Sequence, residues 1–334
     1  MSHPDARRML PRLMKVLFQF PGQGSQYPGM GSDLAEEFSV AREVYERASS
    51  VLGYDLAKLS FEDPDGVLNQ TRYTQPALLA HEAACLAVFK ELTGDSIEPQ
   101  VAAGHSLGEY TALVAAGALT LEASIALVAE RGRLMSELGR GSMLATTLDR
   151  KTAQSIAEKH YCGVAGCNLP DQTVVAGDDE DLAGLAADLR EQGKRAIELK
   201  TEGAFHTYLM VGAAVEFRKV LDSMEFSAPA FSVLSNFTGV LHVADAKEIR
   251  SRLFFQLFNP VLWFDGLAHA LADGIDTIVE FGGGIGKGEG PNEKRPNLES
   301  VAKKTLKHLG LEAQYCAAIN AAGIRAAAET LTNQ

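Results

Sequence analysis

Residues 101–110 read Val101-Ala-Ala-Gly-His-Ser-Leu-Gly-Glu-Tyr110, and this stretch decides the fold. A short apolar run leads into Gly-His-Ser-Leu-Gly, a G-x-S-x-G signature, and an Ala- and Leu-rich segment with helical periodicity follows. In a nucleophile elbow, a strand turns sharply into a helix and holds a serine on strained backbone with its hydroxyl exposed. The stretch therefore predicts an α/β scaffold on which Ser106 is the nucleophile.

The two glycines of this signature are expected to permit the turn itself. Gly104 and Gly108 remove side chains where the strand and the helix crowd each other, and glycine adopts strained dihedral angles at little cost. The N-terminus of the following helix then offers unpaired N–H groups to a developing oxyanion. This arrangement favours acyl chemistry on Ser106.

Apolar runs that look like strands alternate with helical patterns along most of the chain, which is typical of a parallel sheet flanked by helices. The predicted strands are 15–20, 100–103, 231–234 and 277–281, and the predicted helices are 75–92, 107–116, 121–138 and 209–224. Between 141 and 201 the order changes to strand 143–148, helix 151–160, strands 164–168 and 173–176, helix 179–192 and strand 195–200. That β-α-β-β-α-β order is the ferredoxin-like unit.

We therefore predict an α/β protein with two subdomains. A hydrolase-like large subdomain with a parallel sheet comprises 15–140 and 206–310, and a ferredoxin-like small subdomain at 141–205 is inserted into it. Residues 1–14 and 311–334 are predicted to be terminal extensions. The active site is expected in the crevice between the two subdomains, where ligands commonly bind.

Composition excludes several functional classes. A formal net charge of −12 argues against a general nucleic-acid-binding protein, although a local basic patch remains compatible with it. No apolar run approaches the length of a membrane span, and the N-terminus has no apolar core of a secretory signal. We therefore expect a cytoplasmic protein. The four cysteines lack zinc-ligand spacing, which predicts reduced, buried thiols and no metal site.

Ser106 needs a base, because a serine hydroxyl is a weak nucleophile at neutral pH. His105 adjoins it, but successive side chains at a tight turn diverge. His206 is the better candidate, since Gly203-Ala-Phe-His206 lies between the last small-subdomain strand and the next helix, at the mouth of the crevice. The alternative is a histidine at a helix start with no chemical role.

Arg131 is a charge in an apolar stripe. It falls on the same face of the predicted helix 121–138 as Leu127, Leu134 and Leu138. A charge placed there is unfavourable unless an anion meets it, so Arg131 is a candidate ligand for an anionic substrate. An internal salt bridge and a long side chain that reaches solvent are the alternatives. Arg133, in contrast, is expected on the solvated side.

A second motif narrows the chemistry. Phe18-Gln-Phe-Pro-Gly-Gln-Gly-Ser-Gln26 follows the first predicted strand, and ordinary lipases and esterases carry no such loop. Together with residues 104–110, it resembles the malonyl-CoA:acyl carrier protein transacylase family, from about residue 15 to about residue 309. The resemblance implies a ping-pong transfer of malonyl from malonyl-CoA to the phosphopantetheine thiol of an acyl carrier protein, without a cofactor.

The resemblance also implies roles for individual residues. His206 becomes the base, and the segment Gln256-Leu-Phe-Asn-Pro-Val261 supplies the oxygen that orients it, for which we favour Gln256 and Asn259. The alternative for Asn259 is that it caps the turn before Pro260. Arg131 is expected to bind the free carboxylate of malonyl through a bidentate pair.

Further residues are implied around the acyl group. Gln23 and the backbone N–H of Leu107 are expected to form the oxyanion pocket. For Gln23 the alternative is a tight turn without a ligand. Relatives that accept methylmalonyl tend to carry a Tyr-Ala-Ser-His pattern and a glutamine after the nucleophile, whereas this chain has Phe205 and Leu107. We therefore expect unsubstituted malonyl, although rejecting one methyl group is worth only about 1–3 kcal/mol.

One segment departs from the family pattern. Residues 285–296 form a Gly-, Pro- and Lys-rich run without the spacing of a phosphate-binding loop, which predicts a surface loop. It leaves the predicted catalytic set intact and is a place where carrier docking can differ. The expected partners are malonyl-CoA and a carrier protein, with no nucleic acid or membrane, and the chain is expected to be a monomer.

Two alternative functions remain open from the sequence. One is an editing acyl hydrolase of the same fold, which has no use for a buried cation at Arg131. The other is a non-catalytic docking protein, which an acyl-enzyme at Ser106 excludes. The choice between fatty-acid and polyketide synthesis is not readable from the residues.

Overall fold

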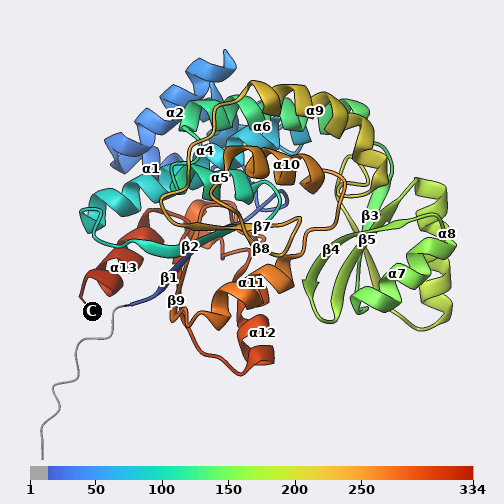
Figure 1. Ribbon diagram of the computed structural model, residues 1–334. Helices are drawn as coiled ribbons and strands as arrows, with labels where there is room; N and C mark the ends of the chain where they lie inside the picture. The colour runs from blue at the N-terminus through green and yellow to red at the C-terminus, as the bar shows by residue number, and fades with distance from the viewer. Residues whose placement is uncertain (1–13, 334) are drawn as a thin grey trace, which may run out of the picture.

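A computed structural model of the protein describes residues 14–333, and two sheets form its framework (Figure 1). The larger sheet has the strand order β10-β9-β1-β2-β7-β8. Its strands are β1 (Val16–Phe20), β2 (Pro99–Gly104), β7 (Ser232–Ser235), β8 (Val240–Leu241), β9 (Thr277–Phe281) and β10 (Gln314–Ala318). All neighbours pair in parallel except β7 and β8. The carboxyl ends of the parallel strands therefore meet at one edge, where ligands bind in open α/β sheets.

Helices cover both faces of this sheet. Along β1, Val16, Phe18 and Phe20 pack into one apolar cluster and Leu17 into another, as the alternation of side chains along a strand requires. The first cluster includes residues of α2 (Ser39–Leu52), α4 (Thr71–Thr93), α5 (Gly108–Ala115), α6 (Leu121–Leu138), α9 (Val211–Ser223) and α13 (Ala321–Thr332). The second includes residues of α11 (Trp263–Ala272) and α12 (Glu299–Leu309).

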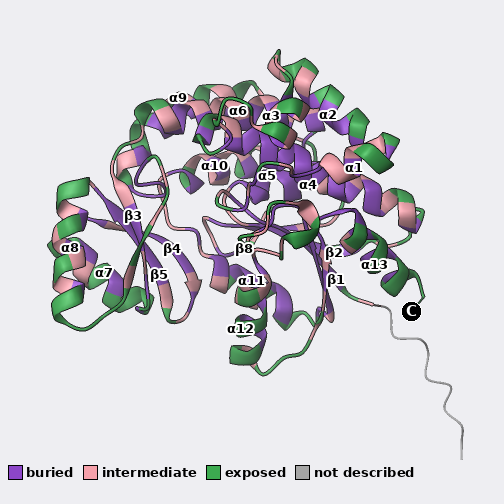
Figure 2. Cartoon of the chain, turned by 180° about the vertical axis from the view of Figure 1, so that it is seen from behind, coloured by how far each residue is buried: buried purple, intermediate pink, exposed green. Residues whose placement is uncertain are grey.

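Shorter elements complete the large subdomain. They are α1 (Ser32–Glu37), α3 (Leu56–Glu62), α10 (Ala246–Gln256) and the 3₁₀ turns Tyr208–Met210 and Pro291–Glu293. Buried residues concentrate in the sheet and in α4 and α5, whereas α7 and α8 expose their outer faces (Figure 2). The elbow therefore lies within the most densely buried part of the molecule.

The small subdomain is an antiparallel sheet of order β4-β5-β3-β6 with two helices. Its elements are β3 (Ser142–Thr146), α7 (Arg150–Lys159), β4 (Gly163–Leu169), β5 (Gln172–Gly177), α8 (Asp179–Glu191) and β6 (Ala196–Leu199). Backbone hydrogen bonds join it to the large subdomain. The N–H of Cys167 donates to the carbonyl of Val261 at 2.8 Å, and the N–H of Val261 donates to the carbonyl of Ala165 at 3.0 Å.

The predicted fold class is confirmed, including the parallel sheet and the ferredoxin-like insertion. The prediction that 311–334 is a terminal extension is wrong. β10 pairs in parallel with β9, from Gln314 opposite Thr277 to Ala318 opposite Phe281, and α13 packs against α4. The predicted extension 1–14 lies outside the described residues except for Met14. All four cysteines are free and buried, as predicted.

Within residues 14–333, no helix is both long enough and apolar enough to traverse a lipid bilayer.

Candidate active site

The Gly-His-Ser-Leu-Gly segment turns from β2 into α5, and Ser106 sits at the turn with a φ of 52°. A non-glycine residue at positive φ is strained and persists only when its surroundings hold it. Both glycines are required by close backbone contacts. A Cβ on Gly104 would lie 1.8 Å from the carbonyl carbon of Gly108, and one on Gly108 would lie 2.3 Å from the carbonyl oxygen of Phe20.

Asn236, directly after β7, clamps the elbow. Its Oδ1 accepts from the N–H of Ser106 at 2.6 Å, and its Nδ2 donates to the carbonyl of Gly104 at 2.7 Å. Its own N–H donates to a carboxylate oxygen of Glu109 at 3.0 Å. Sequence reasoning missed Asn236 and Glu109. Glu109 lies within the quoted motif, but nothing in the residue pattern indicates that it faces the core.

Ser106 and His206 come together from positions 100 residues apart. The serine Oγ lies 2.8 Å from Nε2 of His206, and Nδ1 lies 2.7 Å from the backbone carbonyl of Gln256. A carbonyl oxygen only accepts, so Nδ1 carries the proton and Nε2 offers its lone pair to the serine hydroxyl. The pair therefore has the geometry of a nucleophile and its general base.

Burial strongly disfavours the protonated form of His206. Desolvation is the main cause, and the positive charge of Arg131 adds to it, so the pKa of His206 is lowered to about 3. A neutral imidazole at Nε2 is the form that can take a proton from Ser106.

The backbone carbonyl of Gln256 orients His206, which agrees with the predicted segment and identifies the atom. The prediction for Asn259 is wrong. Its Nδ2 donates to the carbonyl of Phe255 at 2.9 Å, so its side chain caps the end of α10 and does not orient the histidine. The resemblance implied an oxygen from this segment, and the structure identifies it as a main-chain oxygen, which every residue carries.

Arg131 lies on α6 with 1% of its surface exposed, beside Ser106. Its terminal nitrogens donate to Oε1 of Gln75 at 2.8 Å, to Oε1 of Gln256 at 3.1 Å and to Oγ of Ser106 at 3.2 Å. Its guanidinium carbon is 5.3 Å from the ring centroid of Tyr110. Every one of these partners is formally neutral.

The guanidinium of Arg131 therefore remains available to an anion. Its Nε has no hydrogen-bond partner among the described residues, and no Asp or Glu among them forms an ion pair with it. This removes the alternative of an internal salt bridge, and near-complete burial removes the alternative of a solvent-reaching side chain. Arg133, as expected, lies outside and pairs with Glu130 and Glu137.

Leu107 and Gln23 flank the serine from two elements. Leu107 is the N-cap of α5, so its N–H is one of the first of that helix, which have no acceptor within the helix. The Nε2 of Gln23, in the loop after β1, donates to Oγ1 of Thr71 at 3.0 Å. Gln23 also lines the cleft that contains Ser106.

A cleft of about 470 Å³ contains this site. Ser106, His206 and Arg131 line the side formed by the large subdomain. The opposite side is formed by Phe205 together with apolar residues of the small sheet, which are Met143, Ala165, Val174 and Leu199. The small subdomain also contributes Asn168, Lys200 and Thr201 to the lining, so the reacting groups lie on one wall and the other wall is mainly apolar.

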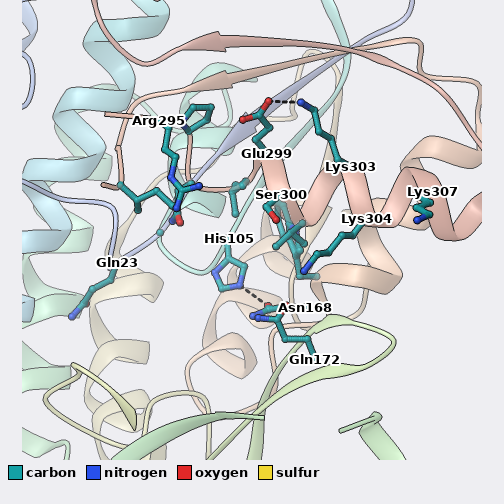
Figure 3. A pocket seen from close by; sticks show the side chains of 17 residues that line it. Gln23, His105, Asn168, Gln172, Arg295, Glu299, Ser300, Lys303, Lys304 and Lys307 are labelled. Atoms are coloured by element: carbon teal, nitrogen blue, oxygen red, sulfur yellow. Dashed lines mark hydrogen bonds and ion pairs between the residues drawn. The ribbon is translucent and has the colours of Figure 1, made fainter. Parts of the chain in front are cut away.

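A second cavity of about 770 Å³ adjoins the cleft and shares Gln23, His105 and Asn168 with it. Figure 3 shows this cavity with Arg295 at one end and the lysines of α12 along its side. Of these, Lys303 pairs with Glu299 at 2.6 Å. The other two lysines of α12 in the lining are Lys304 and Lys307. The approach to the serine is therefore positively charged.

His105 takes part in this approach and not in the dyad. Its Nε2 lies 3.0 Å from Oδ1 of Asn168, and its ring centroid is 5.3 Å from that of Trp263 (Figure 3). The ring nitrogen that contacts the Ser106 hydroxyl belongs to His206, whereas that of His105 contacts Asn168, as the argument from diverging side chains expects.

Comparison with known proteins matches residues 17–282 to the acyl transferase domain. The malonyl CoA-acyl carrier protein transacylase of Bacillus subtilis is 36% identical to this chain over 283 residues, which cover 81% of this chain and 88% of that protein.

Solved structures with the same fold cover nearly the whole chain. The malonyl CoA-acyl carrier protein transacylase from Clostridium perfringens matches with a TM-score of 0.85 and 29% identity over 96% of this chain and 98% of that one. A malonyl-transacylase in complex with a type II polyketide synthase acyl-carrier protein matches with a TM-score of 0.85 and 33% identity, covering 95% of this chain and 99% of that one.

Proposed function

Because this chain belongs to the acyl transferase family, we propose that it transfers malonyl from malonyl-CoA to the phosphopantetheine thiol of an acyl carrier protein. The relatives named above carry this activity in their names, and one of them is bound to a carrier protein. The transfer passes through a malonyl ester of Ser106.

In the first half-reaction, Oγ of Ser106 attacks the thioester carbonyl while Nε2 of His206 takes the hydroxyl proton. The short Oγ–Nε2 distance of 2.8 Å and the Nδ1–H bond to Gln256 favour this direction of transfer. The carbon–sulfur bond then breaks, and the imidazolium returns the proton to the departing CoA thiolate.

In the second half-reaction, the carrier thiol gives its proton to His206 and attacks the ester carbonyl. The carbon–oxygen bond to Ser106 breaks, and the serine oxygen recovers the proton from the imidazolium. In both halves the carbonyl oxygen becomes an oxyanion, which we assign to the N–H groups of Leu107 and Gln23 at the start of α5 and the loop after β1.

One observation carries the choice of acyl group: Arg131 is a buried cation beside the nucleophile with no carboxylate partner among the described residues. An acyl group with a free carboxylate supplies the missing partner through charged hydrogen bonds. A hydrolase of neutral acyl chains gains nothing from such a cation, and this supports transfer of malonyl over editing.

The apolar wall supports unsubstituted malonyl. Phe205 is 5% exposed and packs with Met143 and Val174 at the cleft. We propose that its ring occupies the space that an α-methyl group would need. The discrimination is expected to be modest, at about 1–3 kcal/mol.

The basic cavity beside the cleft fits the phosphate-bearing arm of CoA or of the carrier. Arg295, Lys304 and Lys307 line it (Figure 3), and it shares lining residues with the cleft that contains Ser106. We further propose that the protein is cytoplasmic and acts as a monomer, a proposal that rests on its composition. Light scattering of the purified protein tests the oligomeric state.

The test is the intact mass of the protein after mixing with malonyl-CoA, followed by mapping of the modified peptide. We expect one malonyl adduct on Ser106, released when holo carrier protein is added. Ser106→Ala is the matched control, because the elbow accommodates a small residue. An adduct that persists in this variant, or that water releases as fast as the carrier does, contradicts the proposal.

A further inference from the structure

A second charge is buried beneath the nucleophile. Glu109, on the first turn of α5, has no exposed surface and forms no ion pair with Lys or Arg among residues 14–333. Its carboxylate receives three N–H groups: from the backbone of Asn236 at 3.0 Å, from Nε2 of Gln256 at 2.8 Å and from Nε2 of His242 at 2.7 Å. Three donors and no acceptor are an arrangement that stabilises the ionised carboxylate.

The histidine that contacts Glu109 does not cancel its charge. The side chain of His242 is fully buried, and its Nδ1 has no hydrogen-bond partner among the described residues. An imidazolium would leave a charged N–H donor unpaired at Nδ1, whereas the neutral tautomer leaves only a lone pair there. The neutral tautomer, with its proton on Nε2, therefore fits the structure, and Glu109 retains a net negative charge.

One amide separates this anion from the buried cation. Oε1 of Gln256 accepts from Arg131 at 3.1 Å, and Nε2 of the same side chain donates to Glu109 at 2.8 Å. The same Nε2 donates to the carbonyl of Ser106 at 2.9 Å, and the backbone carbonyl of Gln256 orients His206. The amide dipole thus points its negative end at the cation and its positive end at the anion.

We infer that Glu109 is the counter-charge of the active site, held one amide away from Arg131 so that the guanidinium stays open to the substrate carboxylate. This rests on the proposed malonyl transfer. A carboxylate in direct contact would occupy the guanidinium that the acyl group needs. At one amide's distance, the negative charge still favours the imidazolium that forms on His206, and it weakly repels the incoming carboxylate.

These two effects of one charge have opposite signs, which gives a distinctive kinetic result. Glu109→Gln preserves the shape of the side chain and its three contacts, because the new amide can accept from Asn236 and Gln256 and can donate to Nε2 of His242 once that histidine adopts its other neutral tautomer. The changes are the loss of the negative charge and the move of one neutral N–H to Nδ1 of His242. We expect the malonyl-CoA concentration at half-saturation to fall by at least about threefold, and the maximal rate of acyl-serine formation to fall by at least about tenfold.

Glu82→Gln is the matched control. Glu82 is also a fully buried glutamate, it accepts a hydrogen bond from Thr111 on α5, and burial raises its pKa well above its usual value. Because burial favours the neutral form of this carboxyl, its replacement is expected to leave the charge around Ser106 unchanged. Both kinetic quantities should stay within about twofold of the parent protein.

A second variant covers the case in which Glu109→Gln does not fold. The double variant Glu109→Gln with Gln256→Glu moves the negative charge into contact with Arg131, while the main-chain carbonyl that orients His206 is kept. We expect its half-saturating malonyl-CoA concentration to rise by at least about tenfold, because the guanidinium is now paired.

Rapid-quench measurement of acyl-serine formation over a range of malonyl-CoA concentrations decides the matter. A fall in both quantities for Glu109→Gln, or a rise in half-saturation for the double variant, is the expected result. Glu109→Gln kinetics that match those of Glu82→Gln, or unchanged half-saturation in the double variant, overturn the inference. If the parent protein forms no malonyl-serine at all, it is the proposed function that fails.

Discussion

The two walls of the cleft are built on different principles. On the large-subdomain wall, Ser106, His206 and Arg131 are joined to one another and to Gln256 by hydrogen bonds of 2.7–3.2 Å. The small-subdomain wall presents apolar side chains such as Met143 and Val174. The reacting groups and the buried cation thus belong to one wall, and the other wall, which also carries Asn168 and Lys200, contributes mainly shape.

This division has a structural origin. The polar wall gathers at the carboxyl ends of the parallel strands and at the start of α5, where loops and a helix N-terminus expose polar groups. The apolar wall is one face of an antiparallel sheet, where successive side chains point to alternate faces and the backbone groups pair within the sheet. Substitutions on the first wall should therefore abolish or redirect the chemistry, and those on the second should alter only acyl size.

The largest effect is expected for His206→Ala. Removing the base leaves Ser106 without a proton acceptor, so the rate of malonyl transfer should fall by several orders of magnitude, on the order of 10⁴–10⁶-fold. Steady-state transfer to holo carrier protein measures it, with circular dichroism as the check on folding. Near-normal turnover would return His206 to a purely structural role.

Arg131→Ala should redirect the chemistry more than it slows it. Without the guanidinium, malonyl brings an unpaired anion into the pocket, whereas acetyl brings none. Since a charged hydrogen bond contributes about 1.5–3 kcal/mol, the ratio of malonyl to acetyl loading should fall by at least about tenfold. Acyl-serine formation from the two CoA esters, measured side by side, tests this. An unchanged ratio would revive the editing-hydrolase alternative.

Phe205→Ala probes the apolar wall. Malonyl transfer should remain within about threefold of the parent rate, because no charged contact is lost. Methylmalonyl loading should improve relative to malonyl by roughly five- to tenfold, the lower part of the range for one methyl group. Competition between the two CoA esters, read by mass spectrometry of the acyl-serine, gives the ratio. A collapse of malonyl transfer would show that this wall also carries chemistry.

The smallest effect concerns pH. Burial and Arg131 lower the pKa of His206 to about 3, so the free enzyme keeps its base neutral far below the usual value of 6.5. The acid limb of kcat/KM should therefore lie well below pH 6.5 in the parent protein. In Arg131→Ala it should move upward, because one cause of the lowered pKa is removed. An acid limb near 6.5 in both proteins contradicts this electrostatic coupling.

The sequence predicted the features that depend on residues close to one another in the chain. The glycine spacing around Ser106 and the position of Arg131 in an apolar stripe follow from a turn and a helical period, and both are where they were expected. The position of His206 between the last small-subdomain strand and the next helix made it the candidate base, and the family resemblance supported that role and added the segment of Gln256. Periodicity predicted β1, β2, β7 and β9, the helices α4, α5, α6 and α9, and the order of the six small-subdomain elements.

Long-range partners escaped that reasoning. Asn236 and Glu109 contact each other across 127 positions, and no residue pattern indicates such a pair. Asn259 was misassigned because a main-chain oxygen orients the histidine, and main-chain groups leave no mark in sequence. β10 was missed because its Gln314 and alanines are weak strand formers and it is a short edge strand.

The account's central claim is that Ser106 carries a malonyl group whose carboxylate meets Arg131. The most direct measurement is the intact mass of the protein and of Arg131→Ala after brief exposure to equimolar malonyl-CoA and acetyl-CoA. The account predicts a malonyl adduct on Ser106 of the parent protein and a predominantly acetyl adduct on the variant. A malonyl adduct of equal yield on both proteins, or one on any residue other than Ser106, would contradict it.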